Sequence, residues 1–298
     1  MAKEMKNFAR KNGKKLIISL ANSYIYIILL FFWIVSCAAS PFFRTASTFS
    51  NILISAVPIA LISLGQTIAV ISGGFDLSVG AMASMATCIA SATMQLGIIP
   101  SIIAVLVIAL FIGFINGIGI AVLNIDSFIM TLGMMFILDG INLLVRPVPG
   151  GYVPEGLKGF FLFKIGDFPL IAFFILFLAG IIGYIILQKK HIGRAIYAVG
   201  GNLRSAWFAG INPVSTKIKV YMMSAFFAAL AGIFIMTRIS SGNANAGDPY
   251  LFDSFITVFM GGTLVTGGIG GYGGTLAASL IIASLGSILQ FLGISIWY

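Results

Sequence analysis

The chain has few residues that could catalyse a reaction. Its single histidine, His191, follows two lysines and has no partner for a metal site or a catalytic pair. The sequence also lacks a G-x-x-x-x-G-K-[ST] loop for nucleotide phosphates and a G-x-S-x-G nucleophile turn. We therefore expect no catalytic residue, no metal site and no cofactor on this chain. An intramembrane enzyme is disfavoured for the same reason.

Asp76 is the carboxylate whose neighbours are most informative. It lies in the run Gly73-Gly74-Phe75-Asp76-Leu77-Ser78-Val79-Gly80, between two apolar stretches. Glycine is about 1 kcal/mol worse than alanine inside a helix, so the pair before Asp76 predicts a helix break. Asp76 could then cap the next helix by accepting its free N–H groups. A carboxylate at a broken helix could also line a solute path, and the two interpretations are compatible.

Uncharged polar side chains also occur inside apolar stretches, where they are costly and are candidates for contact with a polar solute. The alternative is hydrogen bonding between helices, which typically contributes less than about 2 kcal/mol. The candidates for a substrate pathway are Gln66, Thr67, Asp76, Asn116, Phe128, Thr131 and Asn142.

The other carboxylates near apolar stretches have simpler interpretations. Asp126 and Asp253 each precede such a stretch, which favours N-capping. Asp139 lies within one, about 10 Å along the helix from Arg146 and too far for a direct pair. We expect it to face the protein interior and to pair with another helix.

Composition shows which elements must position these residues. Hydrophobic residues make up 59% of the 298-residue chain and charged residues 8%, and the mean hydropathy is +1.10. A water-soluble globule needs a charged exterior, so the sequence predicts an all-α polytopic membrane protein with one transmembrane domain, 1–298. We predict about nine transmembrane helices, at 16–39, 51–72, 77–96, 98–123, 127–145, 169–187, 217–238, 252–266 and 272–293.

Glycine-rich breaks fall near 73–80 and 267–274, between the second and third and between the eighth and ninth predicted helices. Transporters are often built from repeats with broken helices at matching places, so the pair could mark an internal repeat. The alternative is chance, because the chain has 35 glycines.

The basic residues predict an orientation. Residues 1–15 hold six of the 17 lysines and arginines, and residues 189–219, which are the loop 188–216 and its flank, hold another six. The positive-inside bias places both in the cytoplasm, which six intervening crossings allow, and 146–168 outside. An excess of positive charge confined to two loops does not indicate nucleic-acid binding.

The cytoplasmic loop contains a candidate docking segment. Asn202 could cap a short helix that Gly210 ends, and this helix would expose Leu203, Trp207 and Phe208. Exposed apolar and aromatic side chains on a polar loop indicate a protein contact. The alternative is an amphipathic segment that lies on the lipid surface.

Several motifs, in order from about residue 45 to the end, resemble the ribose-type permease family of bacterial ABC importers. The family includes ribose, xylose, arabinose, galactose and autoinducer-2 permeases. The motifs are Leu64-Gly65-Gln66-Thr67 with Gly73–Gly80, Ser127–Gly133, Tyr197–Asn202, Ser205–Asn212, and Met260–Thr263 with Gly267-Gly268.

The resemblance implies a permease subunit in the bacterial inner membrane that translocates a monosaccharide or similar small polyol. Its implied partners are a second permease chain, an ABC ATPase that holds ATP and Mg²⁺, and an extracytoplasmic sugar-binding protein. The residues matching the family's ATPase-coupling region are Gly200, Gly201, Asn202, Leu203, Trp207, Gly210 and Ile211.

The chain departs from the family pattern at three places. Asp139-Gly140 stands where many members have Arg-Gly, and Leu251 stands where many have an acidic residue. The family also adds a tenth helix, so we expect the native chain to continue past Tyr298. The alternative function is an ion-coupled secondary transporter of a small polar solute that uses Asp76 and Asp139. The paucity of membrane carboxylates and the docking-like loop argue against it.

Overall fold

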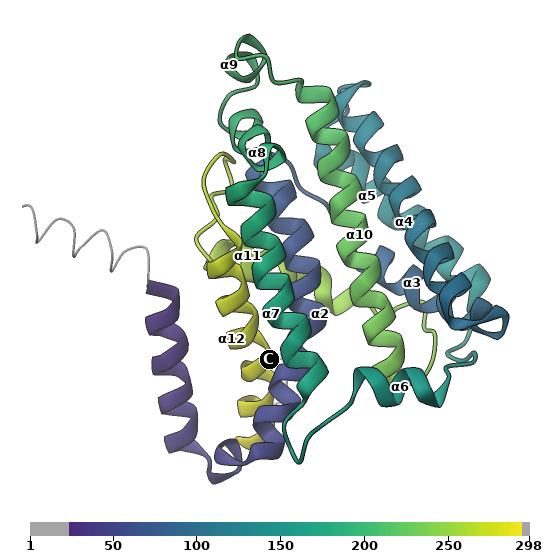
Figure 1. Cartoon of the computed structure of the whole chain (residues 1–298), viewed down its shortest axis with the longest axis vertical. Helices are drawn as coiled ribbons and strands as arrows, with labels where there is room; N and C mark the ends of the chain where they lie inside the picture. The colour runs from purple at the N-terminus through teal and green to yellow at the C-terminus, as the bar shows by residue number, and fades with distance from the viewer. Residues whose placement is uncertain (1–23, 294–298) are drawn as a thin grey trace, which may run out of the picture.

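The structure, a computed structural model, describes residues 24–293 and consists of helices joined by short connections (Figure 1). Within that range the only β-type pairings are two isolated bridges, Gly150 with Gly242 and Ile165 with Phe168. The predicted all-α membrane fold is confirmed. Residues 1–15, predicted to be a basic cytoplasmic segment, lie outside the described range.

Within residues 24–293, seven helical segments are long and apolar enough to cross a membrane. They are α2 (Ala46–Ile71), α3 (Val79–Thr93) continued by a 3-10 turn to Leu96, α4 (Ile98–Ala121), α5 (Ser127–Val145), α7 (Leu170–Tyr184) continued by a π turn to Lys189, α10 (Pro213–Ile239) and α12 (Tyr272–Phe291). The shorter helices are Tyr24–Ala39, Pro41–Arg44, α6 (Glu155–Phe161), α8 (His191–Gly201), α9 (Leu203–Phe208) and α11 (Asp248–Met260).

The eighth predicted span, 252–266, is displaced and shortened. Its helix, α11, starts at Asp248 and has 13 residues, which is about 20 Å against a hydrocarbon core of about 30 Å. A loop from Gly261 to Gly271 continues the apolar stretch, so hydropathy alone merges helix and loop into one span. The first predicted span, 16–39, is described only from Tyr24.

The connection between α10 and α11 turns back into the bundle beside α3. The backbone N–H of Asn243 donates to the Thr87 hydroxyl (3.0 Å), and that of Gly247 donates to the Ser84 hydroxyl (2.8 Å). Gly247 then packs against the backbone of Gly80. α11 therefore begins beside the first turn of α3, inside the bundle rather than at its surface.

α2 forms the centre of the bundle, and it packs against α10, α12, α11 and α7. α4 packs closely on α10 because it has glycines there. A Cβ on Gly117 would lie 2.6 Å from the Ile218 Cα, and one on Gly113 would lie 2.5 Å from the Tyr221 carbonyl oxygen. These glycines therefore allow α4 and α10 to pack closely. Most of the side chains of α4, α5 and α7 face outward.

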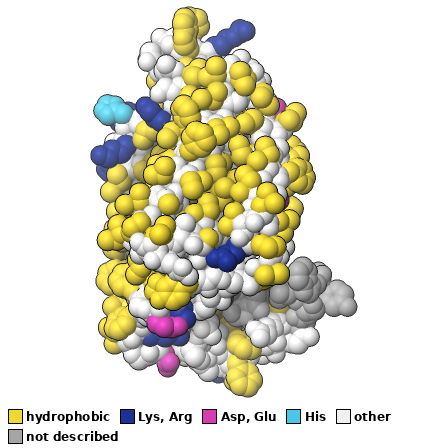
Figure 2. All heavy atoms as spheres, turned by 90° about the vertical axis from the view of Figure 1, so that its right-hand side faces the viewer, with side chains coloured by type: hydrophobic (Ala, Val, Ile, Leu, Met, Phe, Trp, Pro, Cys, Tyr) yellow, Lys and Arg dark blue, Asp and Glu magenta, His cyan; other side chains and the backbone are white. Residues whose placement is uncertain are grey.

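The loops predicted to face opposite sides of the membrane lie at opposite ends of the bundle. α6, from the 146–168 loop, lies at one end, and α8 and α9 lie at the other (Figure 1). Hydrophobic side chains cover much of the flank between them (Figure 2). This arrangement suits a bundle that spans a bilayer.

Candidate functional site

The first glycine-rich break holds Asp76 within the bundle. Gly73 adopts a φ of +80°, which L-residues with side chains rarely adopt, and Tyr221 closes the space beside Gly74. Asp76 is 1% exposed, and its Oδ1 accepts hydrogen bonds from the Ser78 backbone N–H (3.0 Å) and hydroxyl (2.5 Å). α3 starts at Val79 with Ser78 at its N-cap position. The prediction that Asp76 is itself the N-cap is therefore wrong, because Asp76 instead closes the turn before the helix.

Side chains from three helices hold the break in place. From α5, the Ser127 hydroxyl accepts from the Phe75 N–H (3.1 Å) and the Thr131 hydroxyl accepts from the Leu77 N–H (3.0 Å). From α4, the Asn116 amide donates to the Ser78 hydroxyl (3.1 Å). From α10, the Tyr221 hydroxyl donates to the Phe75 carbonyl (3.3 Å). Asp76, Asn116 and Thr131 therefore form one buried polar cluster.

A second polar cluster lies between α2, α11 and α12. The Ser63 and Thr257 hydroxyls lie 2.6 Å apart, and the Thr67 hydroxyl donates to that of Thr275 (3.2 Å). Gln66, between Ser63 and Thr67 in α2, is fully buried, and neither amide atom has a hydrogen-bond partner. Leaving a buried polar group unpaired costs about 1–3 kcal/mol. A polar solute that formed hydrogen bonds with the Gln66 amide would remove this cost, so the amide is a candidate binding group.

The remaining predicted pathway residues differ in position. Asn142 is buried in α5, and its amide donates to the Ala81 carbonyl of α3 (3.0 Å). The Oδ1 atoms of Asn142 and Asn116 are buried without a partner. Phe128 is instead 50% exposed at the start of α5, because its side chain points away from the bundle. The structure does not bring Phe128 together with the buried polar residues.

The two glycine-rich breaks meet each other beneath α8. The Gly268 N–H donates to the Ile71 carbonyl at the end of α2 (2.8 Å). A Cβ on Gly267 would lie 2.9 Å from the Gly73 Cα, and one on Gly200 would strike the Ile71 carbonyl oxygen. Sequence analysis identified each segment but not this contact, since glycine spacing carries no information about tertiary neighbours.

A tyrosine adds a second link between α8 and the later break. The Tyr197 hydroxyl donates to the Gly270 carbonyl (2.8 Å), and burial raises the pKa of this phenol above its ordinary value. The hydroxyl therefore remains protonated and able to donate at neutral pH. α8 is thus bound to the 261–271 loop at two places, Gly200 and Tyr197.

The docking segment has the predicted structure. Asn202 Oδ1 accepts from the Ser205 N–H (2.9 Å) and caps α9, and Gly210 follows its end with a φ of +78°. Leu203, Trp207 and Phe208 are 47%, 64% and 80% exposed. Three large apolar side chains therefore project from one end of the bundle, where a partner protein could cover them.

The carboxylates outside the Asp76 cluster give mixed results. Asp126 caps α5, because its Oδ1 accepts from the Phe128 N–H (2.9 Å). Asp253 lies inside α11, so its predicted capping role is wrong; the helix starts earlier, with Pro249 in its first turn. Asp139 is half-buried and has no ion pair within residues 24–293, contrary to expectation. The same residues contain no group of three potential metal ligands.

A known protein family matches most of this chain. The family model described as branched-chain amino acid transport system / permease component matches residues 48–298. The chain belongs to this family. It is therefore a permease component of a transport system and not an enzyme. Family membership implies a multi-pass protein of the inner membrane that works with an ATPase and a binding protein.

Several named permeases are similar to this chain over most of its length. The chain is 34% identical over 269 residues to the ribose import permease protein RbsC of Escherichia coli (strain K12), covering 87% of this chain and 83% of the relative. It is 30% identical over 298 residues to the galactose/methyl galactoside import permease protein MglC of Haemophilus influenzae, covering 93% and 88%. The inner membrane ABC transporter permease protein YjfF of E. coli (strain K12) is 34% identical over 266 residues. No solved structure matches the chain.

Proposed function

We propose that this permease carries a monosaccharide or a similar small polyol across the membrane. The named ribose and galactose import permeases among its relatives support this substrate class. So do the unpaired Gln66 amide and the unpaired amide oxygens of Asn116 and Asn142, because a sugar hydroxyl can donate to an amide oxygen and accept from an amide N–H. The pathway residues that we propose are Gln66, Thr67, Asp76, Asn116, Thr131 and Asn142.

The second part of the proposal is the assembly. Two permease chains, identical or paralogous, enclose the pathway, and the ATP and Mg²⁺ reside on a separate ABC ATPase. A sugar-binding protein meets the opposite end, near α6. The N-terminus and α9 face the cytoplasm, because the basic segments 1–15 and 188–216 favour that side.

The observation that carries the proposal is that α9 has an exposed apolar surface and that α8, which precedes it, contacts the proposed sugar pathway. Gly200 and Tyr197 of α8 contact the two glycine-rich breaks, and one of those breaks contains Asp76. An ATPase that moves α8 and α9 would therefore move both breaks at once. Such a route couples ATP hydrolysis to the opening of the sugar path.

The proposal is tested by purifying the permease with its ATPase and its binding protein. Ribose- or galactose-loaded binding protein should stimulate ATP hydrolysis by the complex. Truncating a buried aromatic interface anchor costs about 2 kcal/mol or more, so Trp207→Ala should weaken ATPase association at least roughly 30-fold. Phe160→Ala, an exposed aromatic at the other end, is the matched control. Normal ATPase copurification with Trp207→Ala would contradict the docking assignment.

A further inference from the structure

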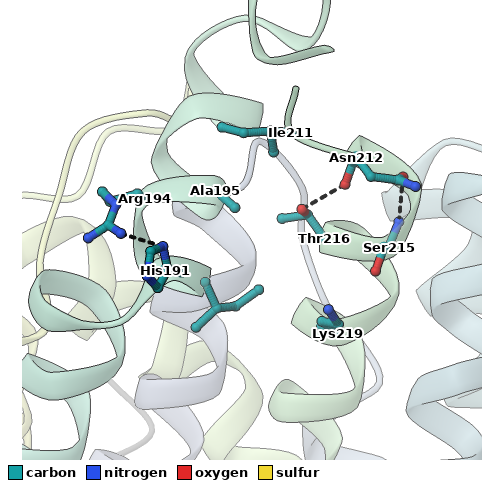
Figure 3. A pocket seen from close by; sticks show the side chains of 9 residues that line it. His191, Arg194, Ala195, Ile211, Asn212, Ser215, Thr216 and Lys219 are labelled. Atoms are coloured by element: carbon teal, nitrogen blue, oxygen red, sulfur yellow. Dashed lines mark hydrogen bonds between the residues drawn. The ribbon is translucent and has the colours of Figure 1, made fainter. Parts of the chain in front are cut away.

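A positively charged cavity lies where α8 meets the start of α10 (Figure 3). It has a volume of about 360 Å³, and its charged or titratable lining residues are His191, Arg194 and Lys219. All three side chains are exposed, and no carboxylate lines the cavity. The cavity is therefore suited to an anion.

The side chains around the cavity are arranged with free donors. The Arg194 guanidinium contacts Nδ1 of His191, and neither Arg194 nor Lys219 has an ion pair within residues 24–293. Ser215 and Thr216 line the α10 side, where Asn212 accepts from the Ser215 N–H (3.0 Å). A phosphate group would find the Arg194 guanidinium, the Lys219 ammonium and the Ser215 hydroxyl there, whereas the Thr216 hydroxyl already donates to the Asn212 carbonyl (2.8 Å).

An apolar groove lies on the same flank of the bundle. It has a volume of about 230 Å³ between α7 and α10, and Leu61 of α2 contributes to its lining. Its near end, toward the cavity, is lined by Ile182 and Phe227, and its far end extends to Phe161 of α6. The groove lacks charged side chains, so it suits a hydrocarbon chain.

The two features lie along one face of α10. Lys219 and Leu230 are eleven residues apart, which places them on the same side of a helix with a rise of about 17 Å between them. Half-buried Met223 and Phe226 lie on this face between them. An acyl chain crosses half of the hydrocarbon core, about 15 Å, so a lipid whose phosphate lies in the cavity would place its chain end in the near part of the groove, between Phe227 and Leu230.

We propose that the cavity and groove together bind one anionic phospholipid of the cytoplasmic leaflet, with its phosphate between Arg194 and Lys219 and an acyl chain between α7 and α10. Charge complementarity selects an anionic headgroup, and the groove selects a lipid over free phosphate. The site differs from the sugar pathway, because its residues face the flank of the bundle and not the polar clusters.

The test titrates the purified permease–ATPase complex, in neutral detergent, with phosphatidylglycerol and counts bound lipid by native mass spectrometry. A basic group near an anionic headgroup contributes about 1 kcal/mol, so Arg194→Gln with Lys219→Gln should raise the half-saturating lipid concentration roughly 30-fold. Lys189→Gln with Lys190→Gln removes the same charge beside the cavity and should leave binding close to wild type. Equal effects of the two double variants, or no effect, would overturn the site.

A second pair of variants distinguishes a lipid from free phosphate. Leu230→Trp fills the groove and should reduce phosphatidylglycerol binding, whereas Phe177→Trp, on an exposed part of α7 outside the groove, should not. If inorganic phosphate displaced the bound species and Leu230→Trp had no effect, the occupant would be a free anion and the proposal would be wrong. Loss of ATPase copurification with unchanged lipid binding in the Arg194/Lys219 variant would instead identify an ATPase contact and also overturn it.

Discussion

At the scale of single residues, Asp76 shows how a buried carboxylate can stabilise a helix break. Its Oδ1 satisfies both polar hydrogens of Ser78, and Asn would retain that oxygen. Asp76→Ala should lower stability by about 1–3 kcal/mol, because it leaves the Ser78 N–H unpaired in the bundle, whereas Asp76→Asn should keep most stability and part of the uptake. Thermal unfolding and sugar uptake of the three proteins check this. An Ala variant as stable as wild type would show that the contact is dispensable.

Gln66 provides the sharpest distinction between a structural and a transport role. Its amide is buried without a partner, so Gln66→Leu should leave stability unchanged or higher. If the amide binds sugar, the same variant should lose most uptake while its thermal stability is retained. As a control, Ser50→Ala removes a buried hydroxyl of α2 that also lacks a partner, and it should leave uptake intact. Equal uptake by Gln66→Leu and wild type would remove Gln66 from the pathway.

At the scale of elements, the contact between α8 and the end of α2 depends on one glycine. A Cβ at Gly200 would collide with the Ile71 carbonyl, whereas one at Gly201 would meet open space. Gly200→Ala should therefore separate α8 from the breaks and reduce ATP-driven uptake several-fold, with a stability cost of about 1–3 kcal/mol from overpacking. Gly201→Ala should behave as wild type. Measuring ATP hydrolysis with uptake shows whether the two become uncoupled; equal coupling in both variants would refute this route.

The elements also show what a sequence can predict. Seven stretches of about 20 apolar residues became spanning helices, because backbone groups in a bilayer must satisfy one another within a helix. Residues 252–266 were predicted as a span because they are apolar, yet they form the end of α11 and the start of a loop, after the chain has turned back beside α3. The Asn202 and Asp126 caps were predictable, since capping is local. The meeting of Gly73, Gly200 and Gly267 depends on tertiary packing and was not.

At the scale of the whole molecule, the account requires α6 and α9 on opposite sides of the membrane. With Cys37 and Cys88 replaced by alanine, cysteines at Lys158 and at Ser205 should react from opposite sides with an impermeant maleimide. Lys158 should react from outside and Ser205 only after the membrane is opened, because the proposed orientation places the basic loop in the cytoplasm. Labelling of both from one side would contradict this topology.

The central claim is that this chain forms the membrane path of an ATP-driven sugar importer. The most direct measurement is uptake of labelled ribose and galactose into proteoliposomes that contain the permease and its ATPase, with ATP and Mg²⁺ on the ATPase side and binding protein on the other. The account predicts uptake that needs ATP, the binding protein and Trp207, and that ionophores leave unchanged. Uptake that continues without ATP and collapses with an ionophore would contradict it and indicate an ion-coupled transporter.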